Sequence, residues 1–282
     1  MVINPSEPLV PREEGSHWYL VDGQPFHEVP RADGNGVRPV TLRDARKVGA
    51  LPSTTNYLGI IHKPQLSSWL IETAITAALT LPRAEGESAD AFARRVVVDM
   101  RSPTESATGT GSAVHDAAEN YGRDHSLPDD PRIAELFAPL KKWMDEEIVE
   151  IAGQEFTVVN TESGYAGRVD LLARLRCAGG AWCVVDFKTQ KVRKDASGEF
   201  KPTWYETWPM QLAAYREGIR HAPDLPNADD IVSVVVGSTE VVPATVRVWP
   251  REEIESHWRA FLAARDLWCH MKGYRPGAGG PL

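Results

Sequence analysis

Short apolar runs with the composition of strands lie mainly in the second half of the chain. Five of them are rich in β-branched and aromatic residues and have the length of strands: 155–160, 169–176, 182–187, 231–236 and 241–249. Gly179-Gly180 separates the second run from the third, and Gly237-Ser238 separates the fourth from the fifth. Both pairs suit tight turns, so the pattern predicts two hairpins within one sheet.

Apolar residues recur with helical spacing in most of the remaining chain. The predicted helices cover 67–78, 88–100, 111–121, 130–148, 210–219 and 250–268. A shorter helix is predicted after Ser53, whose hydroxyl group can cap it. Together the elements predict an α/β fold, with a central mixed sheet flanked by helices and a helical region toward the N-terminus.

The predicted elements fall within one domain. Residues 1–50 are rich in Pro, Gly and charge, which predicts an irregular, loosely packed segment with one short hairpin. The domain then covers 51–275, with a helical part at 51–150 and the core at 151–275. Residues 276–282 are rich in Gly and Pro, which predicts a flexible tail.

Charged residues follow the apolar part of the strand predicted at 182–187. Because side chains on a strand alternate, Asp186 and Lys188 share one face and Phe187 points to the other. A hairpin with the preceding strand brings Asp170 toward Asp186 if the register allows. Two carboxylates and an ammonium at the end of a buried sheet are costly to desolvate unless something pairs with them. A divalent cation that prefers oxygen ligands, Mg²⁺ or Mn²⁺, is the natural partner.

The helix predicted at 111–121 carries a second candidate group. His115 and Glu119 lie one turn apart and project together. A surface ion pair explains this spacing when it occurs alone, whereas beside two carboxylates the imidazole is an acceptable ligand for Mn²⁺ or Mg²⁺. Glu150 and Glu155 precede or open the first strand, where an exposed Glu is common, so neither is counted as a ligand.

Four motifs occur in order along the middle of the chain. They are G-x-x-x-H-x-x-x-E from Gly111, G-R-x-D from Gly167, D-x-K from Asp186 and Q-x-x-x-Y from Gln211. Their order and spacing resemble the PD-(D/E)xK nuclease superfamily, specifically its RecB-type and phage-exonuclease branch. D-x-K alone is weak, but four ordered elements are far more specific. The resemblance covers roughly 108–220 and implies a restriction-endonuclease-like core.

The resemblance implies a role for each matching residue. The metal, one or two ions of Mg²⁺ or Mn²⁺, would be bound by His115, Asp170, Asp186 and Phe187. Glu119 is a further candidate at this site. The residues implied for catalysis are Asp170, Asp186, Lys188, Gln211 and Tyr215. Among them, Lys188 would orient the attacking water or help to deprotonate it.

Substrate-binding residues are predicted in three places. The resemblance implies Arg168, and it implies a terminal phosphate held by Ser53 and Thr55 at a helix N-terminus. A plain capped helix is the simpler interpretation of those two hydroxyl groups. Lys191 and Trp204 lie in a segment that interleaves basic and aromatic residues, as channels for single strands do. A solvated hairpin extension is the alternative there.

Composition limits the class of protein. The net charge of −8 gives no overall attraction for nucleic acid, so DNA binding requires a local basic groove. Three cysteines without C-x-x-C spacing argue against a zinc ribbon or a disulfide framework, and they are too few for a four-cysteine iron–sulfur cluster. No signal peptide or membrane span is predicted. We therefore expect a cytoplasmic protein, bacterial or phage-encoded, with no membrane partner.

The sequence thus predicts a metal-dependent DNA nuclease, with an exonuclease in recombination or repair favoured. Its partner would be DNA, as a single strand or a duplex end, and no protein partner is indicated. A catalytically silent nucleic-acid-binding module is one alternative, although intact Asp170, Asp186 and Lys188 argue against it. A sequence-specific endonuclease would need a base-reading region, and none is evident. An unrelated metal hydrolase built on His115 and Glu119 lacks a second His at ligand spacing.

Overall fold

The structure, a computed structural model, describes residues 17–277, apart from the side chains of 65–66 and 101–108. Contacts divide the described residues into two compact units. One unit is 62–110, and the other combines 17–61 with 111–277. Helix α4 (Ala89–Asp124) contributes residues to both.

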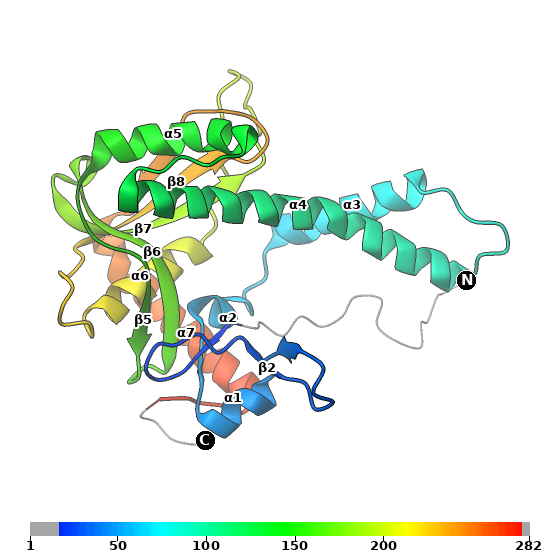
Figure 1. The fold of residues 1–282 in the computed structure, drawn as a ribbon, viewed down its shortest axis with the longest axis horizontal. Helices are drawn as coiled ribbons and strands as arrows, with labels where there is room; N and C mark the ends of the chain where they lie inside the picture. Colours follow the sequence, from blue (N-terminus) through cyan, green and yellow to red (C-terminus); the bar gives the residue numbers. More distant parts are fainter. Residues whose placement is uncertain (1–16, 278–282) are drawn as a thin grey trace. The chain divides into compact units, whose positions relative to one another are not determined.

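The larger unit contains a five-stranded mixed sheet (Figure 1). In spatial order its strands are β5 (Ile148–Asn160), β6 (Tyr165–Leu175), β7 (Ala181–Gln190), β8 (Asp230–Gly237) and β9 (Thr245–Val248). Only β7 and β8 are parallel among these neighbours, and α6 (Thr207–Ile219) lies in the crossover that a parallel pair requires. The predicted α/β fold, with its central mixed sheet flanked by helices, is confirmed.

The predicted hairpin between β6 and β7 is present. A single 3₁₀ turn, η1 (Arg176–Ala178), follows β6, and Gly179 and Gly180 then adopt φ of 65° and 84°. Residues with a side chain rarely adopt this left-handed backbone region, so the two glycines reverse the chain without strain. Counted from the turn, the last residues that pair between β6 and β7 are Leu171 and Val185.

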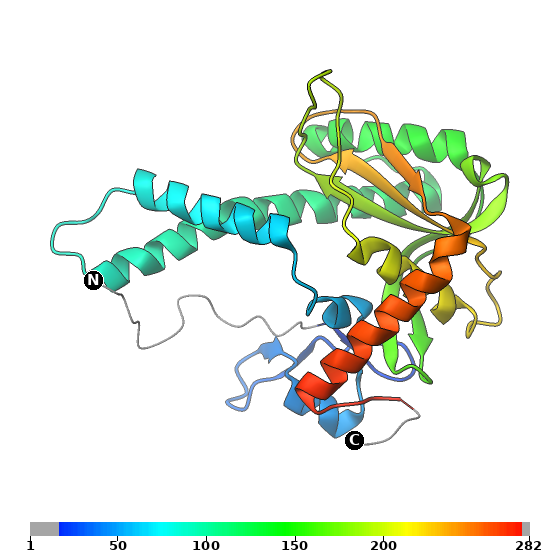
Figure 2. The same ribbon diagram turned by 180° about the vertical axis from the view of Figure 1, so that it is seen from behind.

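Helices cover both faces of the sheet. On one face, α5 (Pro131–Glu147) and the 111–124 part of α4 pack on β6, β7 and β8. On the opposite face, seen from behind in Figure 2, lie α6 and α7 (Arg251–Lys272). Helix α5 begins where Asp130 caps the N–H groups of Arg132 and Ile133, and Pro131 takes the first helical position, where no donor is needed.

The N-terminal segment is more ordered than predicted from His17 onward. It contains β1 (Trp18–Tyr19), β2 (Glu28–Pro30), β3 (Val37–Pro39) and α1 (Leu42–Val48), followed by β4 (Leu51–Pro52) and α2 (Thr54–Leu58). β1 pairs with β4, and Trp18 is buried against Trp268 on α7. Trp18, Val40, Ala45 and Ala50 pack in the core beneath α7, whereas residues 20–39 are half-buried or exposed. Residues 1–16 lie outside the described residues.

The predicted tail is only partly described. The carbonyl of Pro276 lies against Gly164 at the turn between β5 and β6. Residues 278–282 lie outside the described residues.

The smaller unit is helical. It contains α3 (Pro64–Thr80) and the first part of α4. Ala77 and Val96 are buried, whereas Ile71, Ile75 and Leu79 are exposed along one side of α3. Among the described residues, no helix is both long and apolar enough to cross a membrane.

Candidate metal centre

Three carboxylates occupy neighbouring positions on three adjacent strands. Glu155 on β5 lies opposite Asp170 on β6. This position falls between two regular pairs of the two strands, Gln154–Leu171 and Phe156–Val169. The β6–β7 ladder ends one residue before the position where Asp170 lies opposite Asp186 on β7. Glu155, Asp170 and Asp186 are therefore neighbours across the sheet at positions where the ladders have no regular pair.

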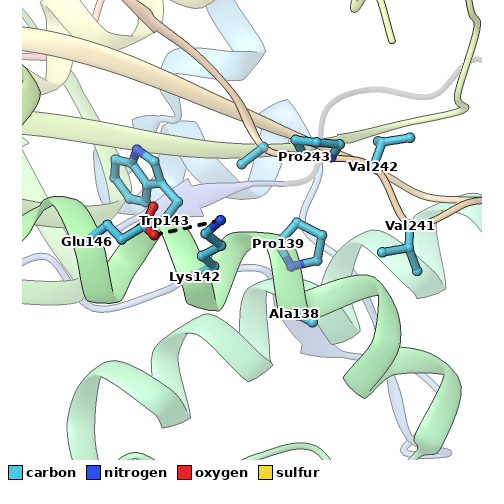
Figure 3. Close-up of a pocket in the computed structure, with 9 residues that line it drawn as sticks. Ala138, Pro139, Lys142, Trp143, Glu146, Val241, Val242 and Pro243 are labelled. Atoms are coloured by element: carbon cyan, nitrogen blue, oxygen red, sulfur yellow. Dashed lines mark ion pairs between the residues drawn. The ribbon is translucent and has the colours of Figure 1, made fainter. Parts of the chain in front are cut away.

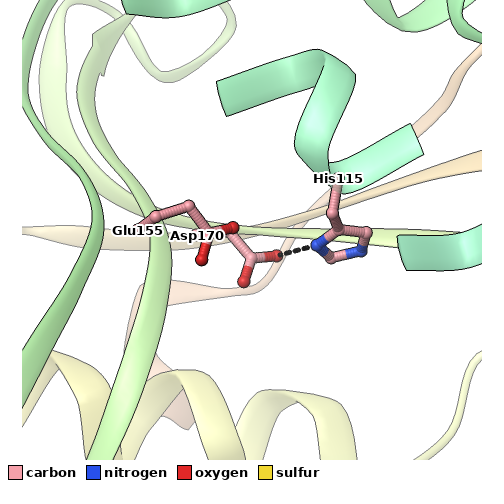
Figure 4. A group of neighbouring side chains, drawn as sticks. All are labelled: His115, Glu155 and Asp170. Carbon is pink, nitrogen blue, oxygen red and sulfur yellow. Dashed lines mark ion pairs between the residues drawn. The ribbon is translucent and has the colours of Figure 1, made fainter. Parts of the chain in front are cut away.

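His115 completes the group from helix α4 (Figure 4). Its Nδ1 atom lies 3.5 Å from Oδ2 of Asp170, and one ligand atom each from His115, Glu155 and Asp170 lie within 4.8 Å of one another. The backbone at Glu155 has a φ of 46°, which is unusual for a residue with a side chain. This strained residue opposes Asp170, and strain of this kind occurs often at functional sites.

Asp186 and Lys188 lie on the same face of β7, as the strand alternation predicts. Nζ of Lys188 donates to Oδ1 of Asp186 at 2.6 Å. Asp186 is 1% exposed, and its Oδ2 atom has no hydrogen-bond partner among the described residues. A buried carboxylate oxygen without a partner is costly, so this atom requires a cation or a donor that the described chain does not supply.

Phe187 contributes differently from its neighbours. Its ring packs in the core beneath α4 and α5, 6.1 Å from the ring of Trp143 and 6.2 Å from that of His115. Its backbone N–H donates to Oδ2 of Asp170 at 2.7 Å. A phenyl ring has no ligand atom, so Phe187 could contact a metal only through its backbone carbonyl.

The charge state of the group follows from burial. Burial, and then the Asp186 carboxylate, raise the pKa of Asp170 to about 7. Burial also lowers the pKa of His115, and the Lys188 ammonium lowers it further, so the imidazole is neutral near pH 7 and able to ligate a metal. Burial alone would lower the pKa of Lys188, but the Asp186 and Asp170 carboxylates outweigh it and raise that pKa. Lys188 therefore remains an ammonium.

The predicted Gln–Tyr pair lies on α6. Nε2 of Gln211 donates to the hydroxyl of Tyr215 at 2.9 Å. Burial raises the pKa of Tyr215, the Thr54 side chain opposes this rise, and the Asp170 and Asp186 carboxylates add to it. The ring of Tyr215 lies directly over Gly167, where a Cβ atom would overlap it. Gly167 in the G-R-x-D motif is thus needed for close packing of helix on strand.

Helix α4 is held against the sheet in a similar way. The amide of Gln154 on β5 occupies the space beside Gly122 that a Cβ atom would fill, and its Nε2 approaches the carbonyl of Ala118 at 3.4 Å. Gly111 faces Thr189 at the end of β7. These contacts at both ends of the segment fix the position from which His115 reaches Asp170.

Two of the predicted substrate residues form a capped helix. Oγ of Ser53 accepts from the N–H of Asn56 and lies 2.9 Å from Oγ1 of Thr55. Ser53 is buried beside Ala166 of β6. The simpler interpretation, a helix cap, accounts for both hydroxyl groups, and phosphate binding by them stays a prediction.

The segment after β7 is only partly available to a ligand. The Trp204 ring is partly buried, with its centre 5.9 Å from that of Trp208 and 6.2 Å from that of Trp249. Arg247 lies over the same ring at 5.6 Å. Lys191 is exposed and forms no ion pair among the described residues. Stacking of a base on Trp204 therefore stays a prediction, and its ring already has three neighbours.

Arg168 and Glu119 lie beside the group, joined to it through Glu155. Nε of Arg168 lies 2.5 Å from Oε2 of Glu155, and Nη2 lies 3.8 Å from Oε2 of Glu119. Arg123 contacts the other oxygen of Glu119 at 3.7 Å. Glu119 thus contacts two arginines and is not part of the triad that could bind a metal.

Glu155 is the candidate ligand that sequence reasoning missed. Its side chain is only 14% exposed, so its interpretation as an exposed first residue of a strand is wrong. Glu150 is exposed and pairs with Arg174 at 3.3 Å, away from the group. The one available signal was the position of Glu155 in register with Asp170, which requires knowing that the strands at 155–160 and 169–176 pair.

The residues present fit a hard divalent cation. Glu155 and Asp170 offer carboxylate oxygens and His115 offers a neutral nitrogen, all close enough to share one ion. Asp186 lies outside that trio and pairs with Lys188 through Oδ1, which leaves its Oδ2 without a hydrogen-bond partner among the described residues. Oxygen-rich sets of this kind suit Mg²⁺, and a nitrogen ligand favours Mn²⁺. The cysteines are not part of the group: Cys183 and Cys269 are buried elsewhere, and Cys177 is exposed.

Comparisons with known proteins add little. No protein-family model matches the chain, and no curated protein matches it. A solved structure described as the crystal structure of SSO0001 is similar over 71% of this chain and 86% of that chain, at 12% sequence identity and a TM-score of 0.28. That score is too low to carry an argument about fold or function.

Proposed function

We propose that this chain is a metal-dependent DNA nuclease of the PD-(D/E)xK type, acting as an exonuclease. One observation supports it most: Glu155, Asp170 and Asp186 lie at neighbouring positions on three adjacent strands, with a buried, unpartnered oxygen on Asp186. Buried carboxylate oxygens normally have a partner, and a bound cation would supply one here. His115 and Lys188 at the same point make the group a reaction centre as well as a binding site.

Each side chain has a distinct task in this proposal. A bound Mg²⁺ or Mn²⁺ would polarise the scissile phosphate and lower the pKa of a water molecule. Lys188, held by Asp186, presents an ammonium that orients the water and offsets the negative charge that develops on the phosphate. Because its pKa is raised, Lys188 is a poor general base. Orienting the water is therefore the favoured part of its predicted role.

The proposed setting follows the same resemblance. The substrate would be a single strand or a duplex end of DNA in the cytoplasm of a bacterium or a phage-infected cell. The three free cysteines fit a reducing compartment. A role in recombination or repair, where DNA ends are processed, belongs to the proposal.

Digestion of end-labelled DNA tests the activity. The wild type should shorten single-stranded or duplex DNA with Mg²⁺ or Mn²⁺, and a chelator should stop it. Asp186→Ala and Lys188→Ala should each lower the rate by at least about 100-fold, because each removes charge stabilisation at the reacting phosphate. Lys142→Ala, which changes an exposed lysine on α5, is the matched control and should be as active as the wild type.

Calorimetry tests the metal site separately from the activity. Mn²⁺ binding should weaken in Asp170→Ala and in His115→Ala.

Folded variants of Asp186 and Lys188 that digest DNA at the wild-type rate would falsify the site. DNA binding without any cleavage would indicate the silent module, and cleavage of closed circular DNA at fixed sequences would indicate the endonuclease.

A further inference from the structure

Arg168 forms an ion pair with a carboxylate that the proposed metal site needs. Its Nε atom lies 2.5 Å from Oε2 of Glu155, and Glu155 also lies within ligand distance of His115 and Asp170. A divalent cation bound to Glu155 would compete with the guanidinium for the negative charge of that carboxylate. The metal-free arrangement therefore occupies Glu155 with the positive charge of the protein itself.

The two partners of this pair differ in exposure. The Glu155 side chain is 14% exposed and the Arg168 side chain is 54% exposed. The carboxylate is thus the fixed partner, and the guanidinium is the one that can move away toward solvent.

Charge balance indicates where the guanidinium would go. In the metal-free group the carboxylates of Glu119, Glu155, Asp170 and Asp186 outnumber the basic groups of Arg168 and Lys188, since Arg123 is shared between Glu119 and Asp124. A divalent cation would offset this excess of negative charge. Arg168 then keeps only Glu119, at 3.8 Å and shared with Arg123. A phosphate oxygen, which accepts two parallel N–H bonds from arginine, would then be a better partner.

We propose that Arg168 is a phosphate-binding residue released by the cation: it pairs with Glu155 in the metal-free protein and binds a DNA phosphate once Glu155 ligates the metal. This inference rests on the proposed function. It adds an order of binding to that function, in which the metal binds first and DNA then binds tightly. Arg168 therefore opposes metal binding and supports DNA binding.

A double-mutant cycle measured by calorimetry with Mn²⁺ tests the first half. Arg168→Gln should tighten Mn²⁺ binding about threefold to tenfold, because the competitor for Glu155 is gone. In a Glu155→Gln background the same change should alter Mn²⁺ affinity by less than about twofold. If Arg168→Gln raised the Mn²⁺ affinity equally in both backgrounds, Arg168 would act by long-range charge repulsion and not through Glu155. If Arg168→Gln weakened Mn²⁺ binding, Arg168 would serve only to position Glu155. Either result overturns the proposal.

Fluorescence anisotropy with labelled DNA tests the second half. Adding Ca²⁺, which replaces the catalytic ion without supporting cleavage, should strengthen DNA binding by the wild type more than by Arg168→Gln. Arg174→Gln is the matched control, since Arg174 pairs with Glu150 across the same two strands. It should resemble the wild type in both assays. Equal strengthening by Ca²⁺ in the wild type and Arg168→Gln overturns phosphate binding by Arg168. If the wild type binds no Mn²⁺ at all, the proposed function itself fails.

Discussion

At the scale of single residues, the stability of the metal-free fold and the proposed metal binding make opposite demands on the charge of Asp170. Burial and the neighbouring Asp186 raise its pKa to about 7, whereas an unfolded chain holds an Asp near 4. Between these two pH values the folded state binds the proton more tightly than the unfolded state. Ionising Asp170 therefore destabilises the metal-free fold, with a penalty that grows from about pH 4 and is complete above about pH 7.

Asp170→Asn should accordingly stabilise the metal-free protein. The amide removes the charge, and its oxygen can still accept the N–H of Phe187. We expect a gain of about 1–3 kcal/mol near pH 8, shrinking as the pH approaches 5, measured as urea midpoints in a chelator. Asp145→Asn is a control of opposite sign, since Lys141 lowers the pKa of Asp145. A gain for Asp170→Asn that does not depend on pH would contradict the assignment of its charge.

The same pKa predicts how metal binding depends on pH. A metal requires the ionised form of Asp170, and that form is replaced by the protonated one below about pH 7. His115 adds little change in this range, because its lowered pKa keeps it neutral. Mn²⁺ affinity should therefore fall about tenfold from pH 8 to pH 6, as calorimetry in matched buffers would show. Constant affinity over this interval would exclude Asp170 as a ligand with this pKa.

At the scale of strands and helices, the close approach of α6 to β6 depends on one glycine. Gly167→Ala would place a methyl group in the ring of Tyr215. We expect a loss of stability of about 1–3 kcal/mol and a loss of activity, since the ring of Tyr215, a predicted catalytic residue, must shift. Thermal unfolding and DNA digestion would measure both.

Gly109→Ala is the control for that substitution. Gly109 lies within α4 and has open space where a Cβ atom would be. Alanine favours a helix by up to about 1 kcal/mol over glycine, so this variant should be as stable as the wild type or more stable. If Gly167→Ala behaves in the same way, the ring of Tyr215 is not held against β6.

The local sequence was sufficient for some of these elements and not for others. Alternation along β7 predicted the shared face of Asp186 and Lys188, because that property depends only on a two-residue period. Glu155 was missed because its place opposite Asp170 depends on the register between two strands and on a strained φ, neither of which is a local pattern. Burial of Trp204 against Trp249 depends on contacts far apart in the sequence.

At the scale of the whole molecule, a net charge of −8 means that DNA is repelled except at a local basic surface. Lys191 follows β7 three positions after Lys188, is exposed, and forms no ion pair among the described residues. Lys194 is exposed as well, but its ammonium contacts Glu240 at 2.8 Å. Of the two, Lys191 is better suited to bind a phosphate of the proposed DNA substrate.

The salt dependence of DNA binding separates these two lysines. Lys191→Ala should weaken binding and reduce the slope of log affinity against log salt by about one at most, because one phosphate contact and its released counterion are lost. Lys194→Ala should change the slope less, since phosphate binding would first require breaking its pair with Glu240. Lys142→Ala on α5 is the control and should leave the slope unchanged. Anisotropy of labelled single strands with Ca²⁺ over a salt series gives all four slopes. If Lys191→Ala matches the wild type at every salt concentration, DNA does not pass over the segment after β7, and the contacts of Trp204 with Trp208 and Trp249 serve only the core.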